Sequence, residues 1–150
     1  MDINNNLFSP SKEDLLLIFE NIPIPAYIWK KFGKNWILVQ SNESARRITD
    51  NQICNYIGIN LLDFYKNKND ILEDFHNCVK SGETVRREME YRYRSTGKAK
   101  NLEVIYRFIN PNLVLVLTID ITENKKPFLK TCLFKRLLLT ILVLIGCKIV

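Results

Sequence analysis

The residues of this sequence whose types and spacing could bind a ligand are mostly aromatic. The stretch from Val85 to Arg94 alternates in polarity, as a half-buried strand does. Its apolar side contains Met89, Tyr91 and Tyr93, and Arg87 lies on that same side. A charged group on an apolar face needs a carboxylate partner or an anionic ligand. Arg87 is therefore the charged candidate for ligand binding.

Aromatic residues from other parts of the chain could complete a small-molecule pocket around this strand. They come from two helical segments and from the next alternating stretch, Leu102 to Ile109. The complete set of pocket candidates is Phe64, Phe75, Arg87, Tyr91, Tyr93, Tyr106 and Phe108. A second interpretation stays open, in which the aromatic side chains only fill a core and Arg87 reaches solvent at its edge. The sequence does not identify a ligand.

The single histidine, His76, is the candidate ligand for a haem iron. It falls in a predicted helix whose apolar stripe consists of Ile71, Phe75, Cys78 and Val79. From the geometry of an α-helix, His76 lies about 100° from the centre of that stripe. Such a flank position is typical of a partly exposed structural histidine. We therefore expect no haem, and haem binding through His76 is kept as an alternative.

The sequence contains no arrangement that indicates catalysis. It has no nucleophile paired with a base, no metal-ligand spacing and no glycine-rich phosphate loop. The cysteines, Cys54, Cys78, Cys132 and Cys147, are far apart and form no C-x-x-C pair. Such spacing is typical of free thiols in a reducing cytoplasm. We therefore expect a cytoplasmic protein that is not an enzyme.

Length and charge limit the classes of protein that fit. A chain of 150 residues with 47% hydrophobic residues can form one domain with an ordinary core. The arginines of the stretch 85–94 are interleaved with glutamates, which argues against nucleic-acid binding. The last 24 residues contain four of the 22 Lys and Arg residues and no acidic residue. The net positive charge of the chain therefore comes largely from its tail.

Hydrophobic periodicity predicts five strands, with helices between the second and the third. The predicted strands are Ala26 to Lys31, Trp36 to Gln40, Val85 to Arg94, Leu102 to Ile109 and Leu113 to Asp120. A capping box at Ser11 and Asp14 predicts an N-terminal helix, and Asp70 to Lys80 predicts a longer one. Short helical turns are expected after Asn42 and over residues 53–62. This order predicts an α+β fold with an antiparallel sheet.

The last predicted strand is apolar on both faces and should lie near the middle of the sheet. One of its faces consists of Val114, Val116 and Thr118. A face of this kind needs an apolar cover. The run Leu15 to Phe19 of the N-terminal helix is the surface that we expect to supply it.

Four sequence features occur in the order and at the intervals of one known family. They are Asn42 with Ala45 after the second strand, Gly58 before a short apolar segment, the helix end at residues 79–83, and the exit Asp120-Ile121-Thr122-Glu123. The exit resembles the D-I-T-E/D signature of PAS domains, the small sensor modules of signalling proteins. The resemblance covers residues 13–126, after an N-terminus of residues 1–12 that we expect to be flexible.

The resemblance implies a PAS-like five-stranded antiparallel sheet, with short helices around a pocket on one face and the N-terminal helix on the other. In this family that helix often mediates dimers. The implied dimer residues are Leu15, Leu16, Ile18 and Phe19, and the implied signal exit is Asp120 and Thr122. The light-sensing branch of the family uses a reactive cysteine within a G-x-N-C-R-F-L-Q segment. Because Cys54 lacks those neighbours, we expect no flavin and interpret Cys54 as a small buried group.

Residues 127–150 differ in composition from the domain before them. Leu137 to Cys147 is an apolar run of 11 residues between basic residues, whereas about 20 residues are needed to span a bilayer. Three interpretations stay open. The tail is a membrane anchor acting through residues 133–150, or a helix packed on the sheet or on a dimer partner, or a truncated or out-of-frame continuation of a longer sensor.

These observations predict a sensory PAS module that binds a small ligand or a partner protein and transmits the change through its C-terminal exit. We expect it to be a piece of a sensor of the histidine-kinase type, acting as a homodimer or with another signalling domain. Two alternatives are kept. One is a ligand-free domain for dimerisation or protein interaction, and the other is a haem-binding sensor.

Overall fold

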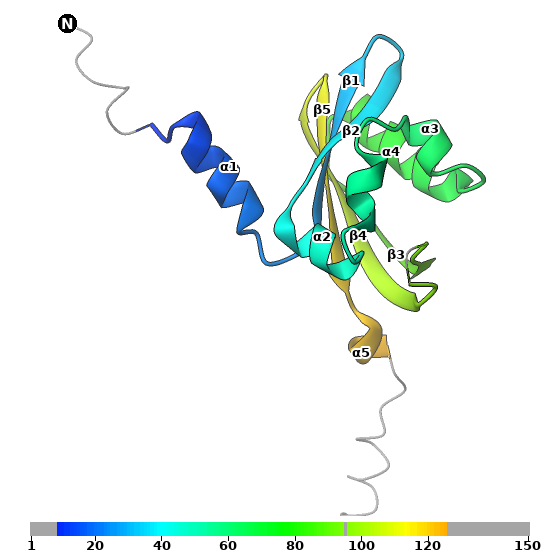
Figure 1. Ribbon diagram of the computed structural model, residues 1–150. Coiled ribbons are helices and arrows are strands. Elements are labelled where there is room, and N and C mark those ends of the chain that lie inside the picture. Colours follow the sequence, from blue (N-terminus) through cyan, green and yellow to red (C-terminus); the bar gives the residue numbers. More distant parts are fainter. Residues whose placement is uncertain (1–8, 95, 126–150) are drawn as a thin grey trace, which may run out of the picture. The chain divides into compact units, whose positions relative to one another are not determined.

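The computed structural model describes residues 9–94 and 96–125, which form an α+β fold with one antiparallel sheet (Figure 1). The strands are β1 (Ala26–Phe32), β2 (Asn35–Ser41), β3 (Val85–Arg92), β4 (Ala99–Asn110) and β5 (Leu113–Asp120). The helical segments are α1 (Lys12–Glu20), α2 (Glu43–Ile48), the 3-10 helix η1 (Gln52–Tyr56), α3 (Leu61–Phe64), α4 (Asn69–Ser81) and α5 (Thr122–Lys125). The predicted fold class is confirmed.

The chain divides into two compact units, one that ends at Asp120 and one that begins at Ile121. The first unit contains the sheet and the helices α1 to α4, and α5 belongs to the second. Most of the predicted flexible N-terminus and the whole predicted tail, residues 127–150, lie outside the described residues. Within residues 9–94 and 96–125, no helix is long and apolar enough to span a membrane.

Strand β5 lies at the centre of the sheet, as its two apolar faces predicted. The strand order is β2-β1-β5-β4-β3, and all neighbouring strands are antiparallel. In the register of the sheet, Val116 of β5 lies between Tyr27 of β1 and Tyr106 of β4. The strand that leads to the C-terminal exit therefore runs through the middle of the domain.

The core lies between one face of the sheet and the helices η1, α3 and α4 (Figure 1). Val114 and Val116 of β5 belong to this core and are 0% and 3% exposed. Residues of α4, among them Phe75, cover them. The prediction that the N-terminal helix covers this face is therefore wrong. Alternation separates the two faces of a strand, but it cannot say which face is the inner one when both are apolar.

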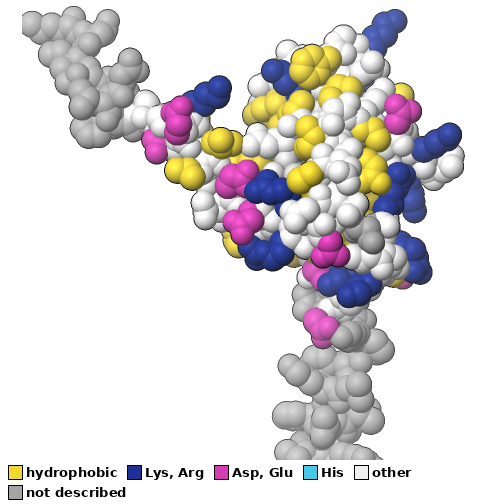
Figure 2. Space-filling view, viewed as in Figure 1, with side chains coloured by type: hydrophobic (Ala, Val, Ile, Leu, Met, Phe, Trp, Pro, Cys, Tyr) yellow, Lys and Arg dark blue, Asp and Glu magenta, His cyan; other side chains and the backbone are white. Residues whose placement is uncertain are grey.

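Helix α1 begins with the predicted capping box, in which Ser11 and Asp14 each accept a hydrogen bond from the other's backbone N–H. Four of its apolar side chains, Leu15, Leu16, Leu17 and Ile18, are 48–60% exposed. Figure 2 shows hydrophobic side chains at the surface of this helix. Only its end is attached to the domain, because Phe19 is buried and the Glu20 carboxylate pairs with Arg46 of α2 at 2.6 Å.

Asn42 fixes the point at which the chain enters the sheet. Its side chain is fully buried, and its Oδ1 accepts hydrogen bonds of 2.9 Å from the backbone N–H groups of Ala26 and Ala45. Its Nδ2 donates to the carbonyl oxygens of Ile22 and Ile24, at 3.0 and 2.9 Å. One amide side chain thus caps α2 and also holds the segment before β1.

Helix α4 presents its apolar stripe to the sheet, as predicted, and buries Ile71, Phe75 and Cys78. It also buries Asp74, which the stripe did not include. Gly82 ends the helix in the left-handed region at φ +70°, where glycine is favoured. Gly58, between η1 and α3, has a φ of +94°, but a Cβ there would meet no atom within 4 Å. The positive φ, which residues with a Cβ rarely adopt, is therefore the reason for glycine at this position.

Candidate functional site

A cavity of about 70 Å³ lies between the sheet and the helices η1, α3 and α4. The residues that line it are Tyr27, Trp29, Leu38, Thr49, Gln52, Ile53, Tyr56, Phe64, Tyr65, Ile71, Met89, Tyr91, Tyr93, Arg94, Leu102, Val104, Tyr106 and Thr118. This set includes all six tyrosines of the chain. The wall is therefore aromatic, with hydroxyl groups distributed around it.

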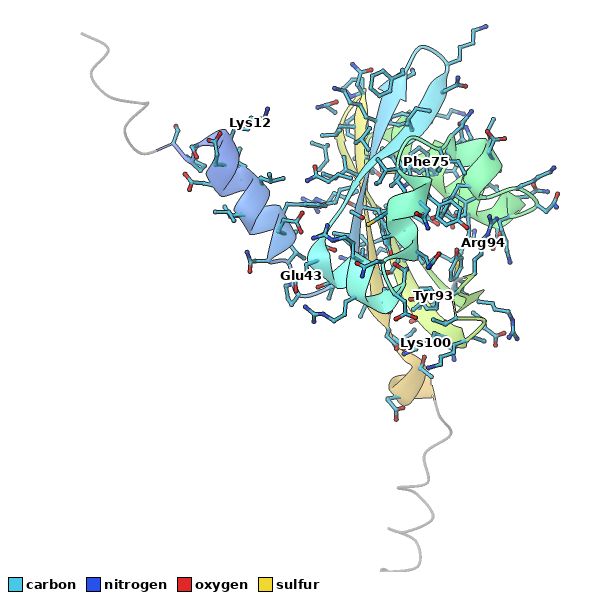
Figure 3. All side chains as sticks on the ribbon, viewed as in Figure 1. Lys12, Glu43, Phe75, Tyr93, Arg94 and Lys100 are labelled. Carbon is cyan, nitrogen blue, oxygen red and sulfur yellow. The ribbon has the colours of Figure 1, made fainter. Side chains whose placement is uncertain are left out.

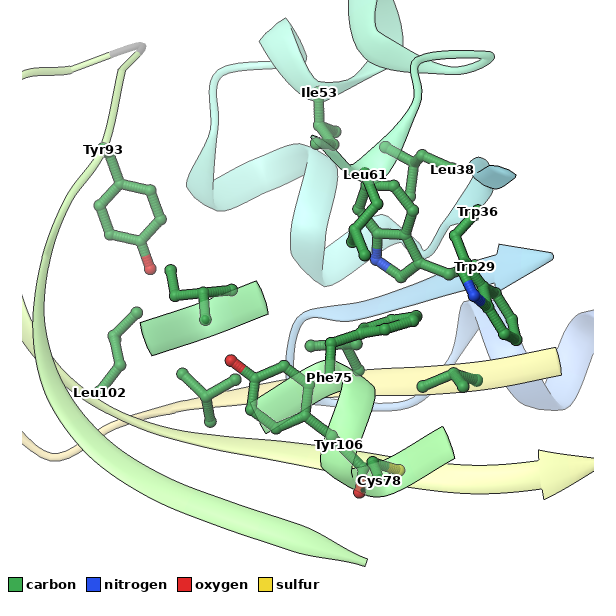
Figure 4. Close-up of a cluster of buried hydrophobic side chains, with 14 residues drawn as sticks. Trp29, Trp36, Leu38, Ile53, Leu61, Phe75, Cys78, Tyr93, Leu102 and Tyr106 are labelled. Atoms are coloured by element: carbon green, nitrogen blue, oxygen red, sulfur yellow. Dashed lines mark hydrogen bonds between the residues drawn. The ribbon is translucent and has the colours of Figure 1, made fainter. Parts of the chain in front are cut away.

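Four buried polar side-chain atoms of the described residues have no hydrogen-bond partner, and all four belong to residues that line this cavity. They are the indole Nε1 of Trp29, the hydroxyl groups of Tyr93 and Tyr106, and that of Thr118. The Thr118 hydroxyl is close to that of Tyr27. Figure 4 shows the hydroxyl groups of Tyr93 and Tyr106 directed into the space between sheet and helices. Because an unpaired buried polar group is costly, these four atoms make the cavity the candidate functional site.

Burial keeps the tyrosines of the cavity protonated. It raises the pKa of Tyr93 to about 12, with a further contribution from the negative charge of Asp120. Burial also raises the pKa of Tyr27 and of Tyr106, and it raises that of Tyr65 well above the ordinary value. These phenols are neutral at physiological pH, so that each can donate a hydrogen bond to a bound molecule.

Arg94 is the one charged residue among those that line the cavity, and the sequence did not point to it. Its guanidinium donates a 2.8 Å hydrogen bond to the carbonyl oxygen of Phe64 and lies 5.6 Å from the centre of that ring. Figure 3 shows Tyr93 and Arg94 next to each other on the side of the sheet that bears the helices. Alternation continued to Arg94 would put this residue on the polar face of the strand, opposite Tyr93. However, β3 ends at Arg92, and the alternation ends with it.

Arg87, the charged candidate from the sequence, does not line the cavity. Its guanidinium forms two hydrogen bonds with the carboxylate of Asp74 on α4, of which the Nη2–Oδ1 bond measures 2.8 Å. This ion pair raises the pKa of Arg87 further above its ordinary value. Of the two partners that the sequence allowed, a carboxylate or an anionic ligand, the structure supplies the carboxylate.

The predicted aromatic residues fall into two groups. Phe64, Tyr91, Tyr93 and Tyr106 line the cavity, whereas Phe75 and Phe108 do not. Phe75 is fully buried and makes edge-to-face contacts with Trp29, Trp36 and Tyr106, so it fills the core beside the cavity. Phe108 is half-buried against the same core. Their apolar periodicity was real, but periodicity does not separate a pocket wall from a packed core.

Neither His76 nor Cys54 lies at the cavity. His76 is exposed on α4, where its Nδ1 lies 2.6 Å from the carbonyl oxygen of Leu72. Cys54 is an exposed free thiol in η1, so the expectation that it is buried is wrong.

The predicted signal exit lies at the end of the central strand. Asp120 closes β5 and forms an ion pair with Lys100 of β4. Thr122 is the first residue of α5 in the second unit. Since Thr118 lines the cavity and Asp120 follows it by two positions, the cavity wall and the exit belong to one strand.

Comparison with known proteins places the fold. No protein-family model matches the sequence, and no curated protein matches it. An RNA-binding light-oxygen-voltage receptor is similar in structure, with a TM-score of 0.65 and 14% identity over 83% of this chain and 37% of that one. This chain therefore spans little more than a third of that receptor.

Two further solved structures resemble this chain over most of their own length. The PAS domain of BvgS from Bordetella pertussis has a TM-score of 0.51 and 14% identity, over 85% of this chain and 95% of that one. A domain of a sensory box sensor histidine kinase/response regulator from Geobacter sulfurreducens has a TM-score of 0.52 and 12% identity, over 72% and 92%. The chain therefore has the PAS fold, as its motifs predicted.

Proposed function

We propose that this chain is a non-catalytic PAS sensory module that binds a small molecule in the tyrosine-lined cavity. One observation supports this most directly. The buried polar atoms without a hydrogen-bond partner, among the described residues, all belong to residues that line one cavity. In a core that only fills space, such groups would be expected to pair with each other or to be replaced by apolar ones. A bound molecule would supply the partners.

The output of the module leaves through the C-terminal exit. Tyr93 and Thr118 line the cavity, and the charge of Asp120 acts on the Tyr93 hydroxyl. A molecule bound to that hydroxyl would change the electrostatic environment of Asp120 and so bias its ion pair with Lys100. Binding would act by shifting the population between two arrangements of this strand end.

The same proposal concerns the protein to which the module belongs. It is a cytoplasmic piece of a larger signalling protein, of the histidine-kinase type or another. The similar domains of BvgS and of the Geobacter histidine kinase support the assignment to a signalling protein through their fold. Its partners would be a second copy or a neighbouring signalling domain.

The experiment is native mass spectrometry of the full chain, together with its absorption spectrum. A bound mass that is lost in a Tyr93→Phe, Tyr106→Phe variant supports the sensory module. The control variant Arg107→Gln changes an exposed position on β4 outside the cavity wall and should keep the mass. A clean apo protein, with the cavity holding only ordered water in a crystal structure, would contradict the proposal.

A ligand-free interaction domain is the second candidate, and the surface of α1 favours it. Leu15, Leu16, Leu17 and Ile18 are about half exposed in the single chain. Apolar side chains in a row on one helix are suited to a helix of a partner. Under this alternative, the variant Leu16→Gln, Ile18→Gln is monomeric and the parent chain dimeric.

A further inference from the structure

The cavity distinguishes between kinds of ligand by the charge of its wall. Of the residues that line it in the described part of the chain, Arg94 is the only one with a charge, and none bears a carboxylate. A cation enclosed there would face the positive guanidinium, and no lining residue would compensate its charge. The carboxylates of Asp120 and Asp74, whose charges act on Tyr93 and Tyr106 from outside the wall, are already paired with Lys100 and Arg87. The wall therefore favours molecules that are neutral or negative.

The unpaired polar atoms further limit the kinds of ligand that the cavity can bind. The indole Nε1 of Trp29 can only donate a hydrogen bond, and a protonated phenol donates its proton to the stronger acceptor. Trp29, Tyr93 and Tyr106 are 1%, 6% and 1% exposed, so bulk water does not satisfy them. Three buried donors require a ligand with several acceptor positions. A carboxylate group has two oxygens and about four acceptor positions.

The guanidinium of Arg94 has donors left for such a group. The described contacts use one Nη2–H, for the carbonyl oxygen of Phe64, out of five N–H donors in a planar fork. Arginine is the residue that binds carboxylates through this fork most effectively. Arg94 lines the cavity next to Tyr93 but is itself an exposed residue, so its positive charge lies where the cavity meets the surface and can pair with a carboxylate there.

We infer that the cavity binds a small monocarboxylic acid as its carboxylate anion. The inference rests on the proposed function and specifies the class of ligand. The donors of Trp29, Tyr93 and Tyr106 and the charge of Arg94 recognise the carboxylate, and the aromatic wall contacts a short apolar chain. The cavity volume of about 70 Å³ limits that chain to a few carbon atoms.

Three small probes test the charge: propionate and propionamide are isosteric, and propylammonium is a slightly smaller cation. Propionate, propionamide and propylammonium are titrated separately into the full chain, and binding is measured by calorimetry and by the shift in melting temperature. Because such small molecules bind weakly, the titration extends into the millimolar range. We expect propionate to bind at least about tenfold more tightly than propionamide, and propylammonium not to bind.

Variants at Arg94 separate the effect of its charge on binding from an effect on the structure of the domain. Arg94→Gln removes the charge and should bring the affinities for propionate and propionamide to near equality, whereas Arg94→Lys should preserve the preference. Arg107→Gln removes an equal charge from an exposed position on β4 and should also preserve it. Tyr93→Phe and Tyr106→Phe should each weaken propionate binding by about tenfold, because each removes a bond to a charged group. The ratio of the two affinities is insensitive to a general loss of stability.

The outcomes separate this inference from the proposed function. If propionamide binds as tightly as propionate, or if Arg94→Gln leaves the ratio unchanged, the carboxylate class is wrong and a small-molecule cavity stands. A co-purified compound without an acid group would likewise contradict the carboxylate class and leave the small-molecule cavity in place. If none of the probes binds and no compound co-purifies, both the inference and the proposed function are wrong.

Discussion

The guanidinium of Arg87 on β3 and the carboxylate of Asp74 on α4 form a two-bond ion pair that joins helix and sheet. The side chain of Asp74 is 7% exposed and that of Arg87 is 39% exposed. The two partners therefore differ in what their removal leaves behind. Without Arg87, a carboxylate remains buried and unpaired, whereas without Asp74 the guanidinium can turn towards water.

We predict that Arg87→Ala lowers the free energy of unfolding more than Asp74→Ala does. The double variant should recover part of the loss, since it leaves no unpaired charge. Urea unfolding of the three variants measures this. Arg86→Ala is the control, because Arg86 pairs with Glu103 on the exposed face, and it should change the free energy by at most about 1 kcal/mol. Equal losses in both single variants would contradict the assigned asymmetry.

Asn42→Ala should be among the most damaging polar substitutions in the domain. It removes four hydrogen bonds to buried or part-buried backbone groups, and we expect a loss of about 3 kcal/mol in the free energy of unfolding. Asn60→Ala serves as the matched control, since Asn60 caps α3 by a single bond on the surface. That control should lose about 1 kcal/mol or less, and a similar loss in both variants would be the contrary result.

The stability of the domain should fall in alkaline solution. Burial raises the pKa of Tyr93 from 10.0 to about 12 in the folded state. Below pH 10 the phenol is neutral in both states and has no effect. As the pH rises from about 10 to about 12, the unfolded chain loses the proton while the folded chain keeps it, so unfolding becomes more favourable. The loss amounts to about 1.4 kcal/mol per pH unit for each such tyrosine.

Unfolding in urea at a series of pH values measures this slope. Tyr93→Phe should give a shallower decline than the parent chain, because one of the shielded phenols is gone. A variant with the same slope as the parent would show that Tyr93 ionises freely in the folded domain. The folded-state titration, followed by the ultraviolet absorbance of tyrosinate, provides a second reading of the same quantity.

Substitutions in α1 should be almost neutral in dilute solution. Leu16 and Ile18 are 48% and 60% exposed, and changing both to Gln should alter the free energy of unfolding by no more than about 1 kcal/mol. Phe19→Ala is the positive control, since Phe19 is 9% exposed and its truncation should lose about 3 kcal/mol. Measurements at low and high protein concentration separate a contact within the chain from one between chains. A large loss at low concentration would mean that the exposed run packs on its own domain.

Sequence patterns were sufficient for the order of the elements. The wet outer face of β3 and the two apolar faces of β5 predicted an edge and a centre, and the strand order has β3 at the edge and β5 in the middle. These features are local, because strand alternation and helix caps depend on residues close in the chain. The capping box at Ser11 and the cap that Asn42 forms on α2 are local features of the same kind.

The wall of the cavity was only half predictable. Strand alternation predicted that Tyr91 and Tyr93 face the interior. Arg94 lies beyond the end of the strand, and alternation in the sequence does not show where a strand ends. The ion pair of Arg87 could not be predicted either. Its partner Asp74 is a polar residue in a helix, and it is not part of the apolar stripe that predicted the buried side of that helix. Both assignments depend on contacts between distant segments, 30 residues apart for Arg94 and Phe64 and 13 for Arg87 and Asp74.

The location of all six tyrosines around one cavity has a consequence for the chemical reactivity of the chain. Phenol-directed reagents such as nitrating agents modify exposed tyrosines first, and the described domain offers them no tyrosine remote from the cavity. Labelling of the intact protein, counted simply as total added mass, therefore reports on access to a single interior space. Every phenol that can react therefore reports on the accessibility of the same cavity.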